Sequence, residues 1–174
     1  MTDKDCTGNS CGVTHPGGIS KHGFGGSRKL FFAELSMPQD GETDGTSPNM
    51  PAWWMLNAQL SRVSQYAQDK NCKCWPECGE FDIMEVHSPG DTRCSSFLHT
   101  VQSNTGGDSN YLERPVGEPI KVAVVMDGNR AVIQKMDPFF KFSKKLDGAD
   151  VEAIVSGKGN GLLNQLGMSL FALP

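Results

Sequence analysis

The chain has 174 residues, of which 37% are hydrophobic and 21% charged, and its formal net charge is −4. This is the size and composition of one globular domain that can bury a core without help from a metal or a partner subunit. The net negative charge argues against a nucleic-acid partner, which needs a concentrated basic surface. No apolar run reaches the roughly 18 residues that a membrane span requires.

The first residues and the cysteines indicate the compartment. The chain opens on the polar segment MTDKD, so no signal peptide is visible. This leaves a cytosolic protein or a mature domain behind an added methionine. Zinc ligation competes with disulfides and free thiols for the cysteines, but their C-x-C-x3-C spacing lacks paired C-x2-C knuckles. We predict three disulfides of open connectivity and a secreted or cell-wall-associated protein. The six cysteines are Cys6, Cys11, Cys72, Cys74, Cys78 and Cys94.

Short apolar stretches separated by glycine and proline predict an all-β fold, a sandwich or barrel, in one domain over residues 1–174. Residues 1–27 form a loop-rich N-terminal segment, and Ala58–Gln68 is the one candidate helix. A hairpin turn is expected at residues 127–129. The expected strands are Leu30–Met37, Pro51–Leu56, Gly79–Val86, Ser96–Gln102, Ile120–Met126, Ala131–Met136 and Met168–Leu173.

Three carboxylates crowd the otherwise apolar segment GEFDIMEV. Acidic residues are depleted in strands, and like charges on one face repel each other. On a regular strand Glu80 and Asp82 share one face, whereas Glu85 points into the core, which is costly for an unpaired carboxylate. One extra residue after Asp82, a β-bulge, returns Glu85 to the face of the other two. We therefore predict a bulge in this strand.

The bulge gives the carboxylates a catalytic spacing. Glu80 and Glu85 become effectively four positions apart, about 13 Å between Cα atoms at ~3.4 Å per residue. Side chains leaning toward one sugar then leave roughly 5–6 Å between the carboxyl groups, the separation of retaining glycosidases. Asp82 between them can hydrogen-bond the nucleophile and hold its pKa low. An acidic edge strand and a calcium loop are the alternatives, and the apolar neighbours disfavour both.

The E-x-D-x-x-E pattern in this segment resembles the signature of glycoside hydrolase family 16, especially its laminarinase-like β-1,3-glucanases. Two stretches agree in order: PAWWML, at residues 51–56, is similar to the family's P-A-x-W-x-L strand, and Leu98–Thr100 to its H-T strand. The sequences NMPAWWMLNA, CKCW and YLERP resemble a divergent branch, the C-terminal domain of fungal cell-wall proteins assigned glucanase activity. The matches run from about Leu30 to Met136.

The resemblance implies a jelly-roll sandwich of two antiparallel sheets with a concave substrate cleft. It also implies roles: Glu80 as nucleophile, Asp82 as supporting acid, Glu85 as acid/base, and Trp54 on the donor side of the cleft. No metal or other cofactor takes part in the implied chemistry. The sequence departs from the family in Met50, where many relatives have tryptophan, and in lacking the W-T-P hairpin. These departures leave the substrate preference open.

The remaining aromatic residues are judged by position. Trp53 and Trp54 alternate along a strand, so we expect Trp53 in the core and Trp54 as a stacking platform for a sugar ring. Trp75 precedes the catalytic strand in a loop, where binding residues are frequent, and packing within that loop is its alternative. His99, on the next strand, is expected to hydrogen-bond the sugar or Glu85, or to be structural. His87, two residues after Glu85, could share its face of the strand, but we consider a role in the cleft a weaker prediction for it than for His99.

These patterns predict a retaining, endo-acting hydrolase of β-1,3-glucan, possibly of mixed-linkage β-glucan, that works by double displacement on cell-wall polysaccharide. The expected partner is a β-glucan polysaccharide or oligosaccharide, and we expect a monomer. A glucan transglycosylase is one alternative, because water and a sugar hydroxyl compete for the same covalent intermediate. A non-catalytic glycan-binding module is another, but all three carboxylates are present. A structural cell-wall protein is the third.

Overall fold

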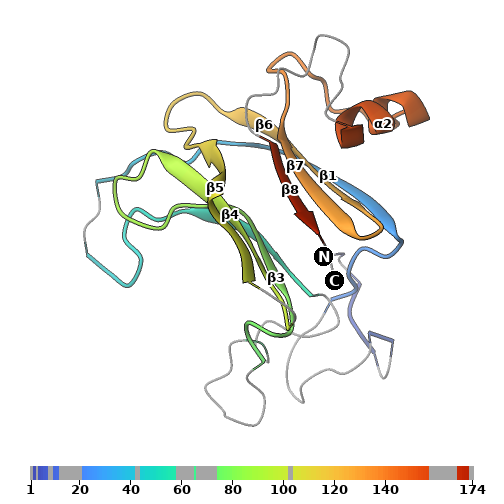
Figure 1. Cartoon of the computed structure of the whole chain (residues 1–174), viewed down its shortest axis with the longest axis horizontal. Helices are drawn as coiled ribbons and strands as arrows, with labels where there is room; N and C mark the ends of the chain where they lie inside the picture. The colour runs from blue at the N-terminus through green and yellow to red at the C-terminus, as the bar shows by residue number, and fades with distance from the viewer. Residues whose placement is uncertain are drawn as a thin grey trace.

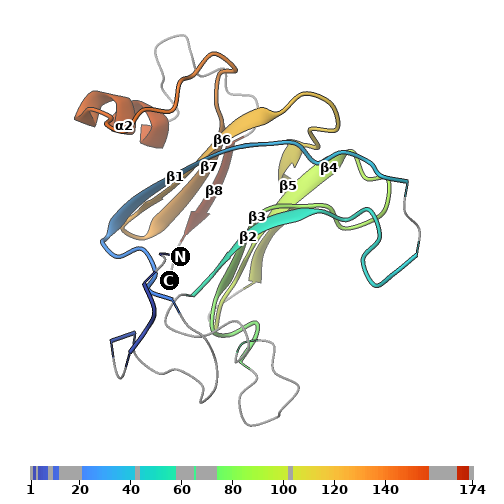
Figure 2. The same cartoon turned by 180° about the vertical axis from the view of Figure 1, so that it is seen from behind.

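The computed structural model describes residues 2, 4–7, 10–11, 21–41, 44–57, 65, 74–101, 104–156 and 168–172. Its strands form two antiparallel sheets of four strands each, in the orders β2-β3-β4-β5 and β1-β6-β7-β8. The two sheets face each other, as Figures 1 and 2 show from opposite sides. The elements are β1 (Arg28–Leu35), β2 (Ala52–Leu56), β3 (Glu80–Glu85), β4 (Arg93–His99), β5 (Asn104–Glu113), β6 (Ile120–Asp127), β7 (Arg130–Lys135), α2 (Gly148–Ser156) and β8 (Met168–Ala172).

The predicted all-β fold of two antiparallel sheets is confirmed. Each predicted strand overlaps an observed one, with ends that differ by a few residues. The expected turn is also present, because β6 and β7 form a hairpin closed at Asp127 and Arg130. The candidate helix Ala58–Gln68 lies outside the described residues except for Gln65, which is helical. Two elements were not predicted from the sequence, β5 and α2.

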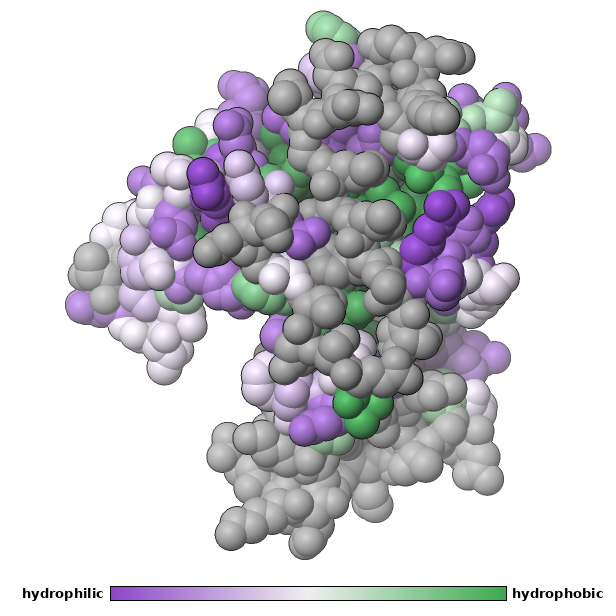
Figure 3. Space-filling view, in the orientation of Figure 1, coloured by the Kyte–Doolittle hydropathy of each residue, from purple (hydrophilic) through white to green (hydrophobic). Residues whose placement is uncertain are grey.

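The main core lies between the two sheets. Phe81 and Ile83 of β3 and Leu98 of β4 meet Val122 and Ile133 of the opposite sheet in one buried cluster. Each such side chain contributes roughly 1.5–3 kcal/mol through its burial. Figure 3 shows the hydrophobic residues mainly toward the middle of one face of the molecule, between hydrophilic residues on either side. The predicted core position of Trp53 is confirmed, since Trp53 packs against this cluster.

The helix α2 covers the other face of the β1-β6-β7-β8 sheet, as seen in Figure 1. Ile154 and Val155 of α2 pack in a second cluster with Val125 and Val132 of the sheet. The helix begins after Asp147, whose side-chain Oδ1 accepts a hydrogen bond from the Asp150 backbone N–H at 2.8 Å, as an N-cap residue does. This sheet is therefore covered on both faces, which explains the continuous apolar run of β6. Among the helices and strands that the structure describes, none packs on the outer face of the β2-β3-β4-β5 sheet, so a site can form there.

Strand β5 approaches β4 closely through one glycine. Gly106 pairs with Phe97 and has a φ of +124°. A Cβ atom at this position would collide with the carbonyl oxygen of Ser96 and lie 2.8 Å from the Cα of Phe97. Only glycine allows this backbone conformation and this approach. Glycine at position 106 therefore allows β5 to pair with β4 at the edge of the sheet.

A buried arginine ties together the loops at one end of the sandwich. Arg114 is 5% exposed. Its guanidinium donates to the backbone carbonyl oxygens of Met37 at 2.8 Å and Pro38 at 2.7 Å, and to Asn49 Oδ1 at 2.6 Å. A further bond reaches the Asp91 carbonyl oxygen at 3.4 Å. One side chain thus connects the segment after β1, the segment before β2 and the loop between β3 and β4.

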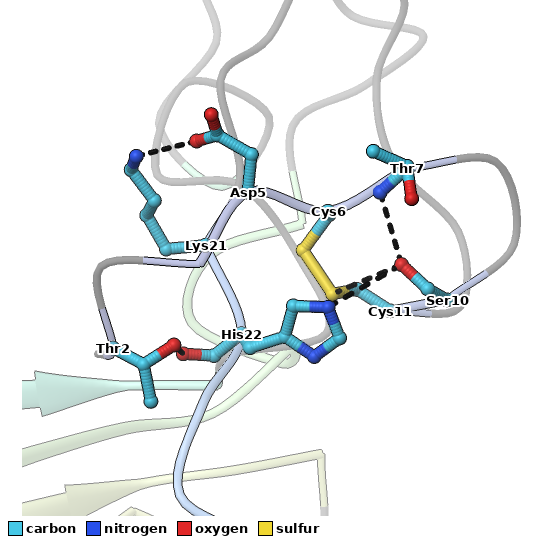
Figure 4. The surroundings of a disulfide bond; sticks show 8 residues. All are labelled: Thr2, Asp5, Cys6, Thr7, Ser10, Cys11, Lys21 and His22. Carbon is cyan, nitrogen blue, oxygen red and sulfur yellow. Dashed lines mark hydrogen bonds and ion pairs between the residues drawn. A yellow bond between two sulfur atoms is a disulfide. The ribbon is translucent and has the colours of Figure 1, made fainter.

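The cysteines differ from the prediction. Cys6 and Cys11 form a disulfide with a Cα–Cα distance of 5.6 Å. Figure 4 shows it in the N-terminal segment beside His22. The expectation that all six cysteines are paired is wrong in this structure, because Cys74, Cys78 and Cys94 are free. Cys94 is fully buried in the main core, where its thiol contacts Met37 Sδ at 3.5 Å and acts as a small apolar side chain. Cys72 lies outside the described residues.

Among the helical residues that the structure describes, no helix is long and apolar enough to cross a membrane.

Candidate active site

The predicted β-bulge in β3 is confirmed. The register of β3 against β4 shifts between Asp82 and Glu85, and the pairing with β2 is irregular at the same place. Ile83 and Met84 are consecutive, and both are fully buried in the core between the sheets. The strand therefore changes phase there, and Glu85 returns to the outer face that carries Glu80 and Asp82. Carboxylate oxygens of Glu80 and Asp82 lie within 4.8 Å of each other, and the charge of Glu85 acts on both.

Glu80 begins β3 and is almost completely buried, with 8% of its surface exposed. The indole Nε1–H of Trp75 donates a hydrogen bond of 2.8 Å to its Oε1. Trp75 stands in the turn that leads into β3, so the predicted loop residue does reach the carboxylates. Burial first, and then the charges of Asp82 and Glu85, raise the pKa of Glu80 to about 7.

Asp82 lies next on the same face and is 5% exposed. Its Oδ2 is 3.2 Å from Nε2 of His99, which ends β4. Burial and the charge of Glu85 raise the pKa of Asp82 to about 6, against the opposing effect of His99 and His87. We expected Asp82 to hold the pKa of Glu80 low. The charge of Asp82 instead raises it, and Asp82 has His99 as its partner.

Glu85 is the most exposed of the three carboxylates and has a histidine beside it. Nε2 of His87 lies 3.3 Å from Glu85 Oε2, and the two side chains are 44% and 31% exposed. The His87 ring also meets the Phe97 ring edge-on, with centroids 4.7 Å apart and an interplanar angle of 74°. Sequence reasoning gave His87 little weight and missed Phe97. Phe97 could have been found, because it lies two positions before His99 and so shares its face of β4.

Aromatic rings form a row beside the carboxylates. Phe97 and His99 lie nearly parallel, with centroids 6.0 Å apart, and Trp75 follows at 5.8 Å from His99. On the other side of β3, Trp54 of β2 is half-buried and pairs in register with Asp82. The carboxylates therefore lie between a tryptophan on β2 and a row of rings formed by two residues of β4 and Trp75. Apolar ring faces next to polar groups are the surface that a sugar binds.

The same side chains could hold a cation. Ligand atoms of Glu80, Asp82 and His99 all lie within 4.8 Å of one another. Two carboxylate oxygens and one imidazole nitrogen are acceptable ligands for a divalent metal ion. A bound metal would occupy the oxygens that acid–base chemistry needs, so the two uses exclude each other. Chemistry without a metal stays a prediction.

The fold and the site together define a β-sandwich domain that gathers three carboxylates on the outer face of one strand. The chain belongs to the family described as "Cell wall protein YJL171C/Tos1, C-terminal", whose model matches residues 1–154. This confirms the predicted similarity to the C-terminal domain of fungal cell-wall proteins, and it agrees with the predicted secreted or cell-wall location.

Several relatives bear one name, "probable circularly permuted 1,3-beta-glucanase". The protein of that name from Arthroderma benhamiae is 46% identical over 167 residues, which cover 91% of this chain and 38% of the relative. TOS1 of Saccharomyces cerevisiae is 35% identical over 163 residues, 92% of this chain and 35% of the relative. TOS1 of Candida albicans is 35% identical over 160 residues, 87% of this chain and 34% of the relative. The chain thus spans little more than a third of these relatives. No solved structure matches it.

Proposed function

We propose that this chain is a retaining, endo-acting hydrolase of β-1,3-glucan that acts on cell-wall polysaccharide as a monomer. The observation that carries the proposal is the β-bulge that gathers Glu80, Asp82 and Glu85 beside a row of aromatic rings. The resemblance of E-x-D-x-x-E to glycoside hydrolase family 16 supports it. The printed name of the relatives, probable 1,3-beta-glucanases, supports the same substrate class.

In the proposed mechanism Glu80 attacks the anomeric carbon and forms a covalent glycosyl intermediate, while Glu85 protonates the leaving oxygen. Glu85 then takes a proton from the water that releases the sugar. The Trp75 N–H, 2.8 Å from Glu80, stabilises the ionised nucleophile. His87 positions Glu85 through their 3.3 Å contact, and His99 does the same for Asp82 at 3.2 Å.

The raised pKa of Glu80 has two consequences for this mechanism. Because attack needs an ionised carboxylate, activity should decline as the pH falls through about 7, the pKa to which burial and its neighbours bring Glu80. The same raised pKa favours a second assignment, in which the protonated Glu80 is the acid and Glu85, the more exposed carboxylate, is the nucleophile. The hydrogen bond from Trp75 favours the first, because it stabilises the charged form.

Azide separates these assignments. Glu80→Gln and Glu85→Gln should both fold and lose several orders of magnitude of activity on laminarin. Azide should restore turnover of an activated aryl β-glucoside by both variants. The product should be the β-glycosyl azide with Glu85→Gln and the α-glycosyl azide with Glu80→Gln. Swapped products would reverse the roles. Glu34→Gln, on the exposed edge of β1, is the matched control.

The products of the wild-type reaction test the remaining alternatives. New reducing ends indicate hydrolysis, whereas longer oligosaccharides without them indicate transglycosylation. Binding of laminarin by a folded wild-type protein with neither product would leave a glycan-binding module and refute the enzyme.

A further inference from the structure

The turn that carries Trp75 is bounded by two free cysteines. The backbone N–H of Cys78 donates to the carbonyl oxygen of Cys74 at 3.0 Å, and Gly79 N–H donates to the Pro76 carbonyl oxygen at 3.1 Å. An i→i+4 hydrogen bond closes a five-residue turn, which brings the two Cα atoms to about 6 Å of each other. Disulfides span Cα–Cα distances of about 4.4–6.8 Å. The Cα separation in this turn therefore lies within the range that a disulfide spans.

The Cys74 side chain also acts on the Cys78 thiol, which donates a hydrogen bond of 3.4 Å to Oε1 of Gln65. Burial and a hydrogen bond with the Cys74 side chain raise the pKa of Cys78 to about 12. Both residues are half-buried, so neither is sealed in the core as Cys94 is. Elsewhere in the chain a disulfide does close a segment of similar length, between Cys6 and Cys11. The family is one of cell wall proteins, and proteins outside the cytosol keep their disulfides.

We propose that Cys74 and Cys78 form a disulfide that locks the turn presenting Trp75 to Glu80. The oxidant is a low-molecular-weight disulfide such as oxidised glutathione. The Cys74 thiolate attacks it and releases one reduced glutathione, and the Cys78 thiol then attacks the mixed disulfide and releases the second. Two thiols lose two electrons and two protons, and one glutathione disulfide takes them up. The closed turn can no longer unwind and withdraw the indole from the carboxylate.

The first test uses the whole chain and does not depend on activity. Trypsin cuts after Lys70, Lys73 and Arg93, so Cys74 and Cys78 fall together in one peptide and Cys72 falls alone in another. After equilibration with oxidised glutathione, the peptide 74–93 should be about two mass units lighter and resist iodoacetamide. Labelling of both thiols would overturn the proposal. So would a cross-link between peptides 71–73 and 74–93.

The second test addresses the link to catalysis, which rests on the proposed function. Dithiothreitol should lower kcat on laminarin by about threefold to tenfold in the wild type, since Glu80 loses a charge-assisted hydrogen bond in part of the molecules. The same loss should persist in the Cys6→Ser/Cys11→Ser variant. It should vanish in a folded Cys74→Ser/Cys78→Ser variant.

The two tests fail in different ways. A lighter peptide 74–93 in a protein inactive on every glucan would refute the proposed function and keep the disulfide. An equal dithiothreitol effect in the Cys74→Ser/Cys78→Ser variant would refute the lock on Trp75.

Discussion

Replacing Glu80 with glutamine should change how the stability of the protein depends on pH. The carboxyl group of Glu80 titrates at about 7 in the folded chain, against an ordinary value of 4.5. Between these values the folded state binds more protons than the unfolded state, so the free energy of unfolding falls as the pH rises through this window. At about 1.4 kcal/mol for each pKa unit, a shift of about 2.5 units gives a fall of roughly 3–4 kcal/mol.

Urea unfolding at several pH values from 4.5 to 7.5, followed by circular dichroism, measures this slope. Glutamine keeps the shape of the protonated acid and does not titrate, so Glu80→Gln should lack most of the fall. A smaller fall should remain in both proteins because burial also raises the pKa of Asp82, to about 6. Glu34→Gln should behave as the wild type. Parallel pH profiles for wild type and Glu80→Gln would refute the idea that Glu80 is buried beside like charges.

Three other substitutions test separate parts of the site and the fold. Trp75→Phe removes one hydrogen bond, so kcat/KM should fall about tenfold and the acid limb of the pH profile should move up by about one unit; an unmoved limb would exclude Trp75 as a partner of the ionised Glu80. Trp54→Ala should raise KM by the equivalent of roughly 1–2 kcal/mol with kcat kept, as steady-state kinetics on laminarin can show. Gly106→Ala should lower the free energy of unfolding by about 3 kcal/mol or more, measured in urea, because its Cβ meets the β4 backbone. Gly117→Ala, with nothing within 4 Å, is its control and should be neutral.

Strand β3 could be predicted in detail because its own residues conflict with a regular strand. Glu85 among apolar neighbours requires a phase change, and the structure has it. Strand β5 could not be predicted, since its sequence NTGGDSNYLE has the composition of a loop and becomes a strand through pairing with β4. The helix α2 is short and its amphipathic pattern is weak, so its sequence alone does not indicate a helix. Packing on the sheet stabilises it.

The sequence predicted which residues form the site better than it predicted their pKa values and hydrogen-bond partners. Glu80, Asp82 and His99 could be named from spacing and resemblance. Which carboxylate has which partner depends on side-chain positions, and the expected Asp82–Glu80 bond gives way to Asp82–His99. The pKa of Glu80 depends on burial, which no spacing reveals. Cys94 likewise has an apolar role, which the even number of cysteines in the chain did not indicate.

The contacts of Arg114 hold the loops together independently of the titration of the carboxylates on β3. A guanidinium stays protonated at any pH the protein meets. Its partners in the loops are carbonyl and amide oxygens, including those of Met37, Pro38 and Asn49, and these do not titrate either. Acid that protonates the carboxylates of β3 therefore leaves the junction of these loops unchanged. A fall in pH can therefore protonate these carboxylates and be reversed while the Arg114 contacts between the loops persist.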